Sequence, residues 1–200
     1  TLVVSNLATP EGNLPDNTVM AQVRLNKSYP DTVRFDYTST DSTAFSDADY
    51  LYTNGTIIFA PGDTLEHIPV TIKGDLINES NEIFFITPFN LVNCTIGGNT
   101  RSRVTINNDD ALPHIIFNNL TVNEGSNDQW NSTSFTIRLN KSYPLPVTVR
   151  YQTLDSTAVD GIDYHSAAGI VSFAPGDTLE TINISILGDR LVERVRHLDP

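Results

Sequence analysis

Seven carboxylic acids in the first 110 residues could act together, because all of them lie in loops between short apolar segments. So many like charges at one place repel one another unless a cation neutralises them. A hard divalent ion that takes about six to eight oxygens suits such a set, and Ca²⁺ tolerates irregular geometry better than Mg²⁺. The alternative is that these acids only cap strand ends and solvate loops. The candidate ligands are Glu11, Asp41, Asp75, Glu79, Glu82, Asp109 and Asp110.

The segments between these loops have the pattern of β-strands. They are short, rich in β-branched and aromatic residues, and largely alternate between apolar and polar side chains. No helical period of 3.6 continues for about 12 residues without a breaker. An antiparallel sandwich is therefore predicted. Because successive strands run in opposite directions, alternate loops lie at the same end of the sandwich. All seven acids are expected at that end, which we call the acidic pole. The predicted strands are residues 2–7, 18–25, 31–38, 57–59, 65–73, 83–89 and 101–107.

The chain contains this unit twice. FAPGDTLE occurs at residues 59–66 and again at 173–180, and LNKSYP occurs at 25–30 and again at 139–144, both with an offset of 114 residues. Several matches in one register indicate an internal duplication. We therefore expect an all-β chain of two tandem antiparallel sandwiches, of which residues 1–110 form the first.

The second sandwich is predicted to be incomplete. Its match to the first covers residues 111–193, so the last two strands have no counterpart, and residues 194–200 form a tail that departs from the repeat. A sandwich without two strands leaves apolar side chains uncovered and a sheet edge unpaired. We expect either a tail that is foreign to the domain or a natural chain that continues.

The repeated residues resemble a known family. The series DSTA, DY, G, FAPGDT, IxVxI and DxxxExxExF, ending in TINNDD, is similar to the Calx-beta domain over residues 1–110 and partly over the second repeat. That family is best known from the cytoplasmic loop of sodium–calcium exchangers, and it also occurs in extracellular matrix and adhesion proteins. The resemblance implies an immunoglobulin-like sandwich that binds Ca²⁺ at the acidic pole through the seven acids named above.

Departures from the family pattern predict fewer ions or weaker binding. Gly74 stands where calcium-binding members carry another Asp, and Asn108 where an acid is common. Asp49 is interpreted as a structural hydrogen-bonding residue rather than a ligand. In the second repeat Arg196 falls at the position of Glu82 and the terminal acid pair is missing, so no complete site is expected there. The matching acids of that repeat are Glu124, Asp155, Asp189 and Glu193.

The composition argues against several functions. A net charge of −12 argues against nucleic acid and anionic membranes as partners, and the single cysteine excludes an internal disulfide. No apolar run approaches the roughly 20 residues that cross a bilayer. None of the four histidines forms an obvious triad with a serine or cysteine. We therefore expect a non-catalytic module that neither binds nucleic acid nor inserts into a membrane.

Our first functional prediction is a calcium-binding structural or interaction module of a larger extracellular or cell-surface adhesion or matrix protein. Its partners would be Ca²⁺, the neighbouring domains of the parent chain and cell-surface or matrix proteins. The last predicted strand of the first sandwich ends at the acidic pole, so this pole faces the start of the second repeat. Bound Ca²⁺ is therefore predicted to stiffen the junction between the repeats. The alternatives are an accessory module of a secreted enzyme and a cytosolic calcium sensor on the cytoplasmic face of a membrane transporter.

Overall fold

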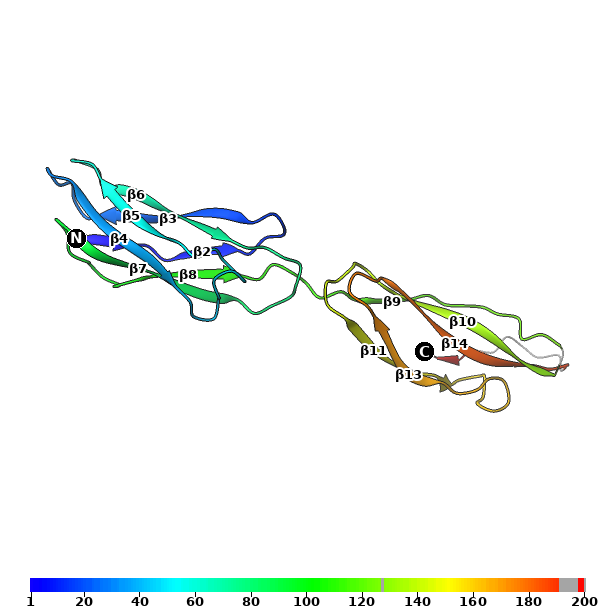
Figure 1. Ribbon diagram of the computed structural model, residues 1–200. Coiled ribbons are helices and arrows are strands. Elements are labelled where there is room, and N and C mark those ends of the chain that lie inside the picture. Colours follow the sequence, from blue (N-terminus) through cyan, green and yellow to red (C-terminus); the bar gives the residue numbers. More distant parts are fainter. Residues whose placement is uncertain (127, 191–197, 200) are drawn as a thin grey trace. The chain divides into compact units, whose positions relative to one another are not determined.

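The computed structural model describes residues 1–126, 128–190 and 198–199 of two compact units, unit 1 (Thr1–Ala111) and unit 2 (Leu112–Pro200) (Figure 1). The described residues form strands, turns and loops, and none of them belongs to a helix that could cross a membrane. The prediction of an all-β chain of tandem sandwiches is thereby confirmed.

Unit 1 consists of two sheets. All neighbouring strands are antiparallel except β2 and β8, which run parallel. The three-stranded sheet has the order β1 (Leu2–Val4), β3 (Asn17–Leu25) and β6 (Leu65–Ile72). The five-stranded sheet has the order β2 (Leu7–Pro10), β8 (Ser102–Asn107), β7 (Glu82–Val92), β4 (Val33–Thr40) and β5 (Asn54–Phe59).

The strand predicted over residues 2–7 is in fact two strands in different sheets. β1 pairs with β3, whereas β2 pairs with β8 in the opposite sheet. The chain changes sheets at Ser5 and Asn6. The Ser5 carbonyl oxygen accepts a hydrogen bond from the Ser102 hydroxyl (2.5 Å), and Asn6 Oδ1 accepts one from the Arg103 backbone N–H (2.9 Å). These bonds redirect the chain without interrupting its apolar alternation, so the pattern alone predicts a single strand.

The core of unit 1 follows from the alternation along its strands. In β4 the inward side chains Val33, Phe35 and Tyr37 are at most 6% exposed, while the residues between them are exposed or half-buried. The rings of Tyr50 and Phe84 stack in this core with their centroids 3.7 Å apart. Fully burying a large apolar side chain stabilises a fold by about 1.5–3 kcal/mol.

The repeated FAPGDT sequence builds the same turn in both units. Gly62 has φ +92° and donates its backbone N–H to the Tyr29 carbonyl oxygen (2.9 Å). Gly176 has φ +88° and donates in the same way to the Tyr143 carbonyl oxygen (2.9 Å). Glycine adopts this left-handed conformation without the strain that a Cβ would cause.

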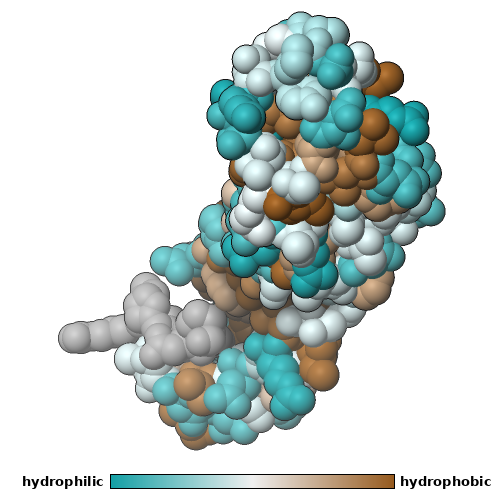
Figure 2. All heavy atoms as spheres, turned by 90° about the vertical axis from the view of Figure 1, so that its left-hand side faces the viewer, coloured by the Kyte–Doolittle hydropathy of each residue, from teal (hydrophilic) through white to brown (hydrophobic). Residues whose placement is uncertain are grey.

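Unit 2 repeats the arrangement of unit 1 with fewer strands. One sheet has the order β14 (Leu179–Gly188), β10 (Gln129–Leu139) and β9 (Ile115–Phe117). The opposite sheet contains β11 (Val147–Gln152) and β13 (Ala168–Phe173), and a short pair joins β12 (Leu154–Asp155) to β15 (Leu198–Asp199). The core is smaller and centres on Phe173, Tyr164 and Ile137. In the space-filling view of Figure 2, in which unit 1 faces the viewer, hydrophobic side chains lie among hydrophilic ones on the visible surface.

The strand β15 pairs as the beginning of β7 does. Leu154 pairs with Asp199 in unit 2, and Thr40 pairs with Phe85 in unit 1 at the same 114-residue offset. Residues 198–199, which we expected in a tail departing from the repeat, therefore keep the register of the repeat. The ladder is formed by backbone N–H and C=O groups, so these two pairs can form although the residue types differ from those of unit 1. Glu193 and Arg196 lie outside the described residues.

Candidate metal centre

Loops that are distant in sequence meet at one pole of unit 1. The parallel pairing of β2 with β8 brings the residues after both strands together, because parallel strands end on the same side. The Glu11 N–H donates to the Asn107 carbonyl oxygen (2.9 Å), and the Gly12 N–H donates to Asp109 Oδ1 (3.1 Å). The first and last loops of the domain are thus joined directly.

Glu11, Asp109 and Asp110 form the first carboxylate group. Each offers an oxygen within 4.8 Å of the oxygens of the other two. Glu11 and Asp110 are each only 8% exposed, whereas Asp109 is exposed. Oxygens that ligate one Ca²⁺ at about 2.3–2.6 Å lie no more than about 5 Å apart, so this spacing fits a calcium ion.

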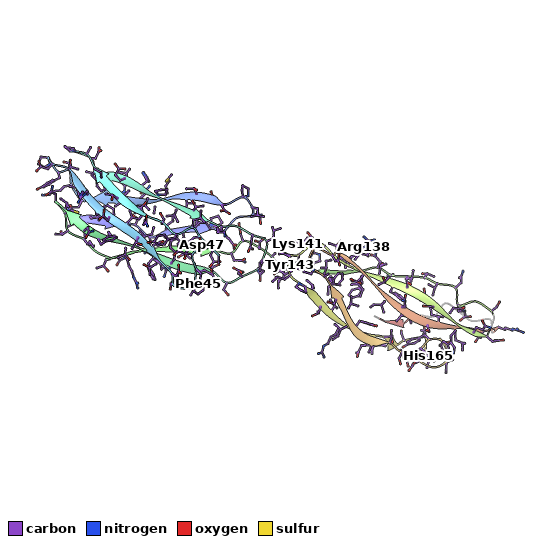
Figure 3. The ribbon with its side chains drawn as sticks, viewed as in Figure 1. Phe45, Asp47, Arg138, Lys141, Tyr143 and His165 are labelled. Carbon is purple, nitrogen blue, oxygen red and sulfur yellow. The ribbon has the colours of Figure 1, made fainter. Side chains whose placement is uncertain are left out.

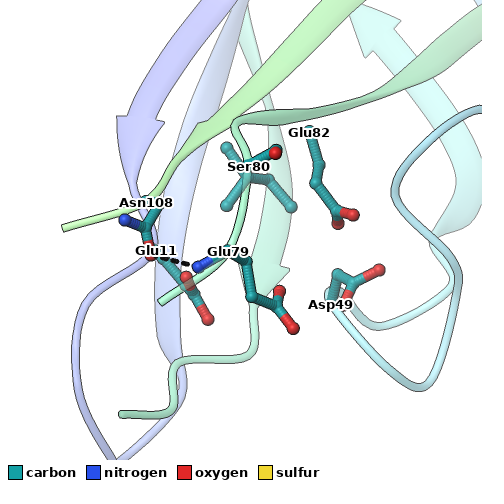
Figure 4. A pocket seen from close by; sticks show the side chains of 7 residues that line it. Glu11, Asp49, Glu79, Ser80, Glu82 and Asn108 are labelled. Carbon is teal, nitrogen blue, oxygen red and sulfur yellow. Dashed lines mark hydrogen bonds between the residues drawn. The ribbon is translucent and has the colours of Figure 1, made fainter. Parts of the chain in front are cut away.

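Asp49, Glu79 and Glu82 form a second carboxylate group, with one oxygen of each again within 4.8 Å of the others. Their side chains point toward one another in Figure 4. They share a pocket with Glu11, which links the two groups. We call this the carboxylate pocket; it is lined by Glu11, Asp49, Glu79, Ser80, Glu82, Ile106 and Asn108.

Amide side chains hold the loops of the carboxylate pocket together. Asn108 Oδ1 accepts a hydrogen bond from the Glu79 backbone N–H (3.0 Å), drawn as a dashed line in Figure 4. Asn108 and Asn78 each donate a side-chain N–H to the Asp110 carbonyl oxygen, at 3.0 and 2.5 Å. An ionised Asp at position 108 could not donate to that carbonyl. The asparagine that departs from the family pattern therefore positions the acids around it.

Gly74, the other departure from the family pattern, packs against the loop that carries Glu11. A Cβ at this position would lie 2.2 Å from the Gly12 carbonyl oxygen and 2.7 Å from its carbon. No side chain fits there unless one of the two loops moves. The loop of Gly74 and the loop of Glu11 therefore lie closer together than an Asp at position 74 would allow.

The pocket is electrostatically unfavourable without a cation. Burial raises the pKa of Glu11 to about 7, with further contributions from Asp75, Glu79, Asp110 and Asp109 in that order. Burial also raises the pKa of Glu82 to about 7, followed by its hydrogen bond to Asp49 and the charges of Asp49 and Glu79. The pKa of Glu79 rises mainly through burial, too. A divalent cation would neutralise these charges.

Asp75 lies beside the carboxylate pocket but in neither group. It is half-buried, and its negative charge raises the pKa of both Glu11 and Glu79. Its Oδ1 accepts a hydrogen bond from the Ile77 N–H (2.6 Å), which shapes its own loop. Its role as a ligand stays a prediction.

Asp41 holds its loop in place and is also outside both groups. Its Oδ1 accepts hydrogen bonds from the Tyr50 hydroxyl (2.6 Å) and the Ser46 N–H (2.9 Å), and the bond from Tyr50 is the main cause of its lowered pKa. Unit 2 repeats the arrangement, since Asp155 accepts from the Tyr164 hydroxyl at 2.7 Å. For Asp41 and Asp155 ligation remains a prediction, while the hydrogen bonds define a structural role in both units.

Asp49 has the structural role that the sequence suggested, and it also contributes a carboxylate to the candidate metal site, which the sequence did not suggest. Its Oδ2 accepts a hydrogen bond from the Phe45 N–H (2.7 Å), in the loop where Figure 3 labels Phe45 and Asp47. The same residue belongs to the second carboxylate group. Its place in the loop that carries Asp41, at the acidic pole, was the signal that could have identified it.

Unit 2 lacks a comparable group among its described residues. Glu124 and Asp189 are half-buried, Asp155 is exposed, and Glu193 lies outside the described part of the chain. Arg190 follows Asp189 and its Nε lies 3.2 Å from Asp128 Oδ2, which places a cation beside this end of β14. That unit 2 has no complete site stays a prediction, because Glu193 lies outside the described residues.

The family model of the Calx-beta domain matches residues 4–110 and again residues 109–198. The chain therefore belongs to the Calx-beta domain family, as two tandem domains. Its membership supports the prediction of a non-catalytic module.

Several relatives are sodium/calcium exchangers. The chain is 31% identical to sodium/calcium exchanger 2 of Rattus norvegicus and of Homo sapiens over 186 residues, covering 82% of this chain and 19% of each exchanger. It is 25% identical to sodium/calcium exchanger 3 of Mus musculus over 198 residues, covering 88% of this chain and 21% of the exchanger. The chain thus spans about a fifth of the length of these relatives.

A solved structure shares the tandem fold. The crystal structure of calcium binding domain CBD12 of CALX1.1 matches with a TM-score of 0.51 and 20% identity, covering 94% of this chain and 76% of that chain. CBD12 from CALX1.2 matches with the same TM-score and identity, covering 92% of this chain. At this identity the likeness establishes the fold alone.

Proposed function

We propose that this chain is a calcium-binding regulatory module of a transporter of the sodium/calcium exchanger type, with the calcium site at the acidic pole of unit 1. One observation carries the proposal: carboxylates from loops distant in sequence converge in two groups with the spacing of calcium ligands. The residues that would hold Ca²⁺ are Glu11, Asp49, Glu79, Glu82, Asp109 and Asp110.

The relatives favour the cytosolic alternative over the extracellular adhesion or matrix protein that we first predicted. The named relatives are sodium/calcium exchangers, and one matched structure is the calcium binding domain CBD12 of CALX1.1. Because the family is best known from the cytoplasmic loop of such exchangers, we infer a module on the cytoplasmic face of a membrane protein. Ion exchange itself would belong to the rest of that protein, since the chain covers 19% of exchanger 2.

Calcium titration by isothermal calorimetry tests the site. We expect saturable binding to the 200-residue chain, weakened at least about tenfold by Glu82→Gln, because the variant removes a charged oxygen ligand from the second carboxylate group. Asp63→Asn is the matched control, since Asp63 is an exposed acid in the turn between β5 and β6. Binding that is equal in all three proteins would contradict the proposal.

Stiffening of the junction by Ca²⁺ remains a prediction that depends on this site. Asp109 and Asp110 belong to the first carboxylate group, and unit 2 begins at Leu112. Holding those two carboxylates on a cation would restrict the backbone that leads into unit 2. Small-angle scattering should then show a narrower distribution of distances with Ca²⁺ than with chelator; identical distributions would rule out the stiffening but not the binding.

A further inference from the structure

A second pocket of unit 1 is lined by basic and neutral side chains, and its described lining contains no carboxylate. Its volume is about 300 Å³, at the lower end of the range of small-molecule sites. The carboxylate pocket offers only about 10 Å³, which suits a single ion or water molecule. We call the second pocket the arginine pocket; it is lined by Asn6, Phe85, Asn99, Thr100, Arg101 and Arg103.

Strand alternation turns both arginines of this pocket outward. Ser102 and Val104 are 0% exposed and point into the core. The residue between them, Arg103, and the residue before them, Arg101, therefore lie on the outer face of the sheet and are exposed. Arg103 pairs with Phe85 of β7, and the guanidinium carbon of Arg101 lies 3.6 Å from the centroid of the Phe85 ring. The ring thus holds Arg101 beside Arg103.

Both guanidinium groups keep donors available for a ligand. Arg24, by contrast, donates to Gln22 Oε1 (3.2 Å). Among the described residues, no ion pair engages Arg101 or Arg103, and Phe85 offers Arg101 only the face of its ring. A guanidinium carries five N–H donors in a fixed fork. Two neighbouring cations without an acid between them favour the binding of an anion.

Neutral side chains around the arginines add further donors. Asn6 Oδ1 accepts a hydrogen bond from the Arg103 backbone N–H (2.9 Å), so the amide N–H groups of Asn6 remain to donate. Asn99 and Thr100 contribute another amide and a hydroxyl. A lining rich in donors suits an anion with several acceptor oxygens.

The acidic pole is too distant to repel an anion from the arginine pocket. The arginines lie at the start of β8, whereas Asp109 and Asp110 follow its end. The strand separates the two sites by roughly 17 Å, at about 3.4 Å per residue. Charges are screened over about 8 Å at physiological ionic strength. Unit 1 can therefore hold ions of opposite sign at its two ends.

We propose that the arginine pocket binds the phosphate group of a small organic phosphate monoester, with Arg101 and Arg103 on the phosphate oxygens. A phosphate monoester carries a charge of about −1.5 to −2 at pH 7, which matches two guanidinium groups. The planar fork of each guanidinium fits two of its oxygens. The volume of the pocket leaves room for the organic part of the molecule. The inference does not depend on calcium.

NMR titration of the full chain with phenyl phosphate tests this site. Saturable shifts are expected for the backbone amides of Asn6 and of residues 99–103, which line or join the pocket. Phenyl sulfate is the matched control ligand, because it has the same shape but only a single negative charge. It should bind at least about tenfold more weakly, since charge-assisted hydrogen bonds depend on the charge of the acceptor.

Two arginine variants sharpen the test. Arg103→Gln should weaken the binding of phenyl phosphate at least about tenfold and leave the unfolding temperature unchanged, because the side chain is exposed and outside the contact between Arg101 and Phe85. Arg24→Gln is the matched control, since it removes an exposed arginine from β3 of the opposite sheet, and it should bind as the wild type does. Equal binding by all three proteins, or equal binding of both ligands by the wild type, would overturn the proposal.

A lipid headgroup offers the same phosphate chemistry. Co-sedimentation with vesicles of phosphatidylcholine and phosphatidic acid, which carries a phosphate monoester, distinguishes this source. We expect the chain to stay in the supernatant, because its net charge of −12 opposes association with an anionic surface. Sedimentation that Arg103→Gln abolishes would assign the pocket to a lipid headgroup and overturn the proposal of a small organic phosphate.

Discussion

The two units share the hydrogen bonds that shape their loops but not the charges that those loops carry. Asp41 accepts from Tyr50 in unit 1 and Asp155 accepts from Tyr164 in unit 2, with distances that differ by only 0.1 Å (2.6 and 2.7 Å). Only unit 1 gathers its acids into groups with calcium spacing among the described residues. The comparison teaches that one part of the repeated motif builds the loop, whereas a separate set of acids forms the candidate metal site.

The units also differ in how completely they bury their cores. Phe84 in β7 of unit 1 is 0% exposed and stacks on Tyr50, whereas Phe117 in β9 of unit 2 is 52% exposed. Phe84→Ala should destabilise unit 1 by about 3–5 kcal/mol, and Phe117→Ala should destabilise unit 2 by less than about 1 kcal/mol. Urea unfolding followed by circular dichroism, with fluorescence of Trp130 as the reporter of unit 2, measures both. Equal losses would contradict the difference in burial.

The carboxylate pocket should make the stability of unit 1 depend on pH. The pKa of Glu11 and of Glu82 rises from the ordinary 4.5 to about 7 in the folded unit 1, so folding favours their protonated forms. The resulting penalty is absent below the unfolded pKa and complete above the folded one. In chelator, unit 1 should therefore lose on the order of 2 kcal/mol between pH 5 and pH 8, allowing for partial solvent screening. Unfolding of the Glu11→Gln/Glu82→Gln variant should depend less on pH; an unchanged slope would contradict this origin.

Gly74 tests how closely the loops of unit 1 must approach. Gly74→Ala places a Cβ 2.2 Å from the Gly12 carbonyl oxygen, so the loop carrying Glu11 must move. Overpacking of this kind costs about 1–3 kcal/mol, and calcium affinity should fall with it. Gly55→Ala is the control, because the three atoms nearest to its Cβ all belong to the Tyr37 side chain (closest atom 3.0 Å), which is not among the candidate ligands. Calcium titration of both variants checks the prediction, and equal affinities would refute it.

The smallest effect is expected at the tyrosine–aspartate hydrogen bond that both units share. Tyr50→Phe and Tyr164→Phe each remove one hydroxyl that donates to a carboxylate and should each cost about 1 kcal/mol of the free energy of unfolding. The two losses should be similar, because the bonds are equivalent. Thermal unfolding of the two single variants measures them, and a loss confined to one unit would show that the shared loop is not equally stabilised in both.

Much of the fold could be predicted from the sequence because alternation and duplication are local signals. The strands from residue 18 to residue 107 and the turns at Gly62 and Gly176 follow from residue types that favour those conformations. The division of residues 2–10 between two sheets could not, because it depends on hydrogen bonds to Ser102 and Arg103, which are distant in sequence.

The candidate site was predicted in outline only. Placing alternate loops at one pole identified Glu11, Glu79, Glu82, Asp109 and Asp110, all of which lie in the two carboxylate groups. Asp49 was interpreted as a structural residue rather than a ligand, yet it lies in the second carboxylate group, whereas Asp41 was named as a ligand from its loop position and lies in neither group. Asp49 lines the pocket and Asp41 does not; Asp41 instead accepts a hydrogen bond from the Tyr50 hydroxyl, which the sequence does not reveal.

Thermal unfolding of unit 1 with Ca²⁺ and with chelator tests the central claim most directly. A ligand that binds only the folded state adds about 2.7 kcal/mol at 100 times its dissociation constant, so the unfolding temperature of unit 1 should rise with Ca²⁺ and stay unchanged in the Glu82→Gln/Asp110→Asn variant. The Trp130 signal of unit 2 should respond far less. A wild-type unfolding temperature that is the same in Ca²⁺ and in chelator would contradict a calcium site at this pole.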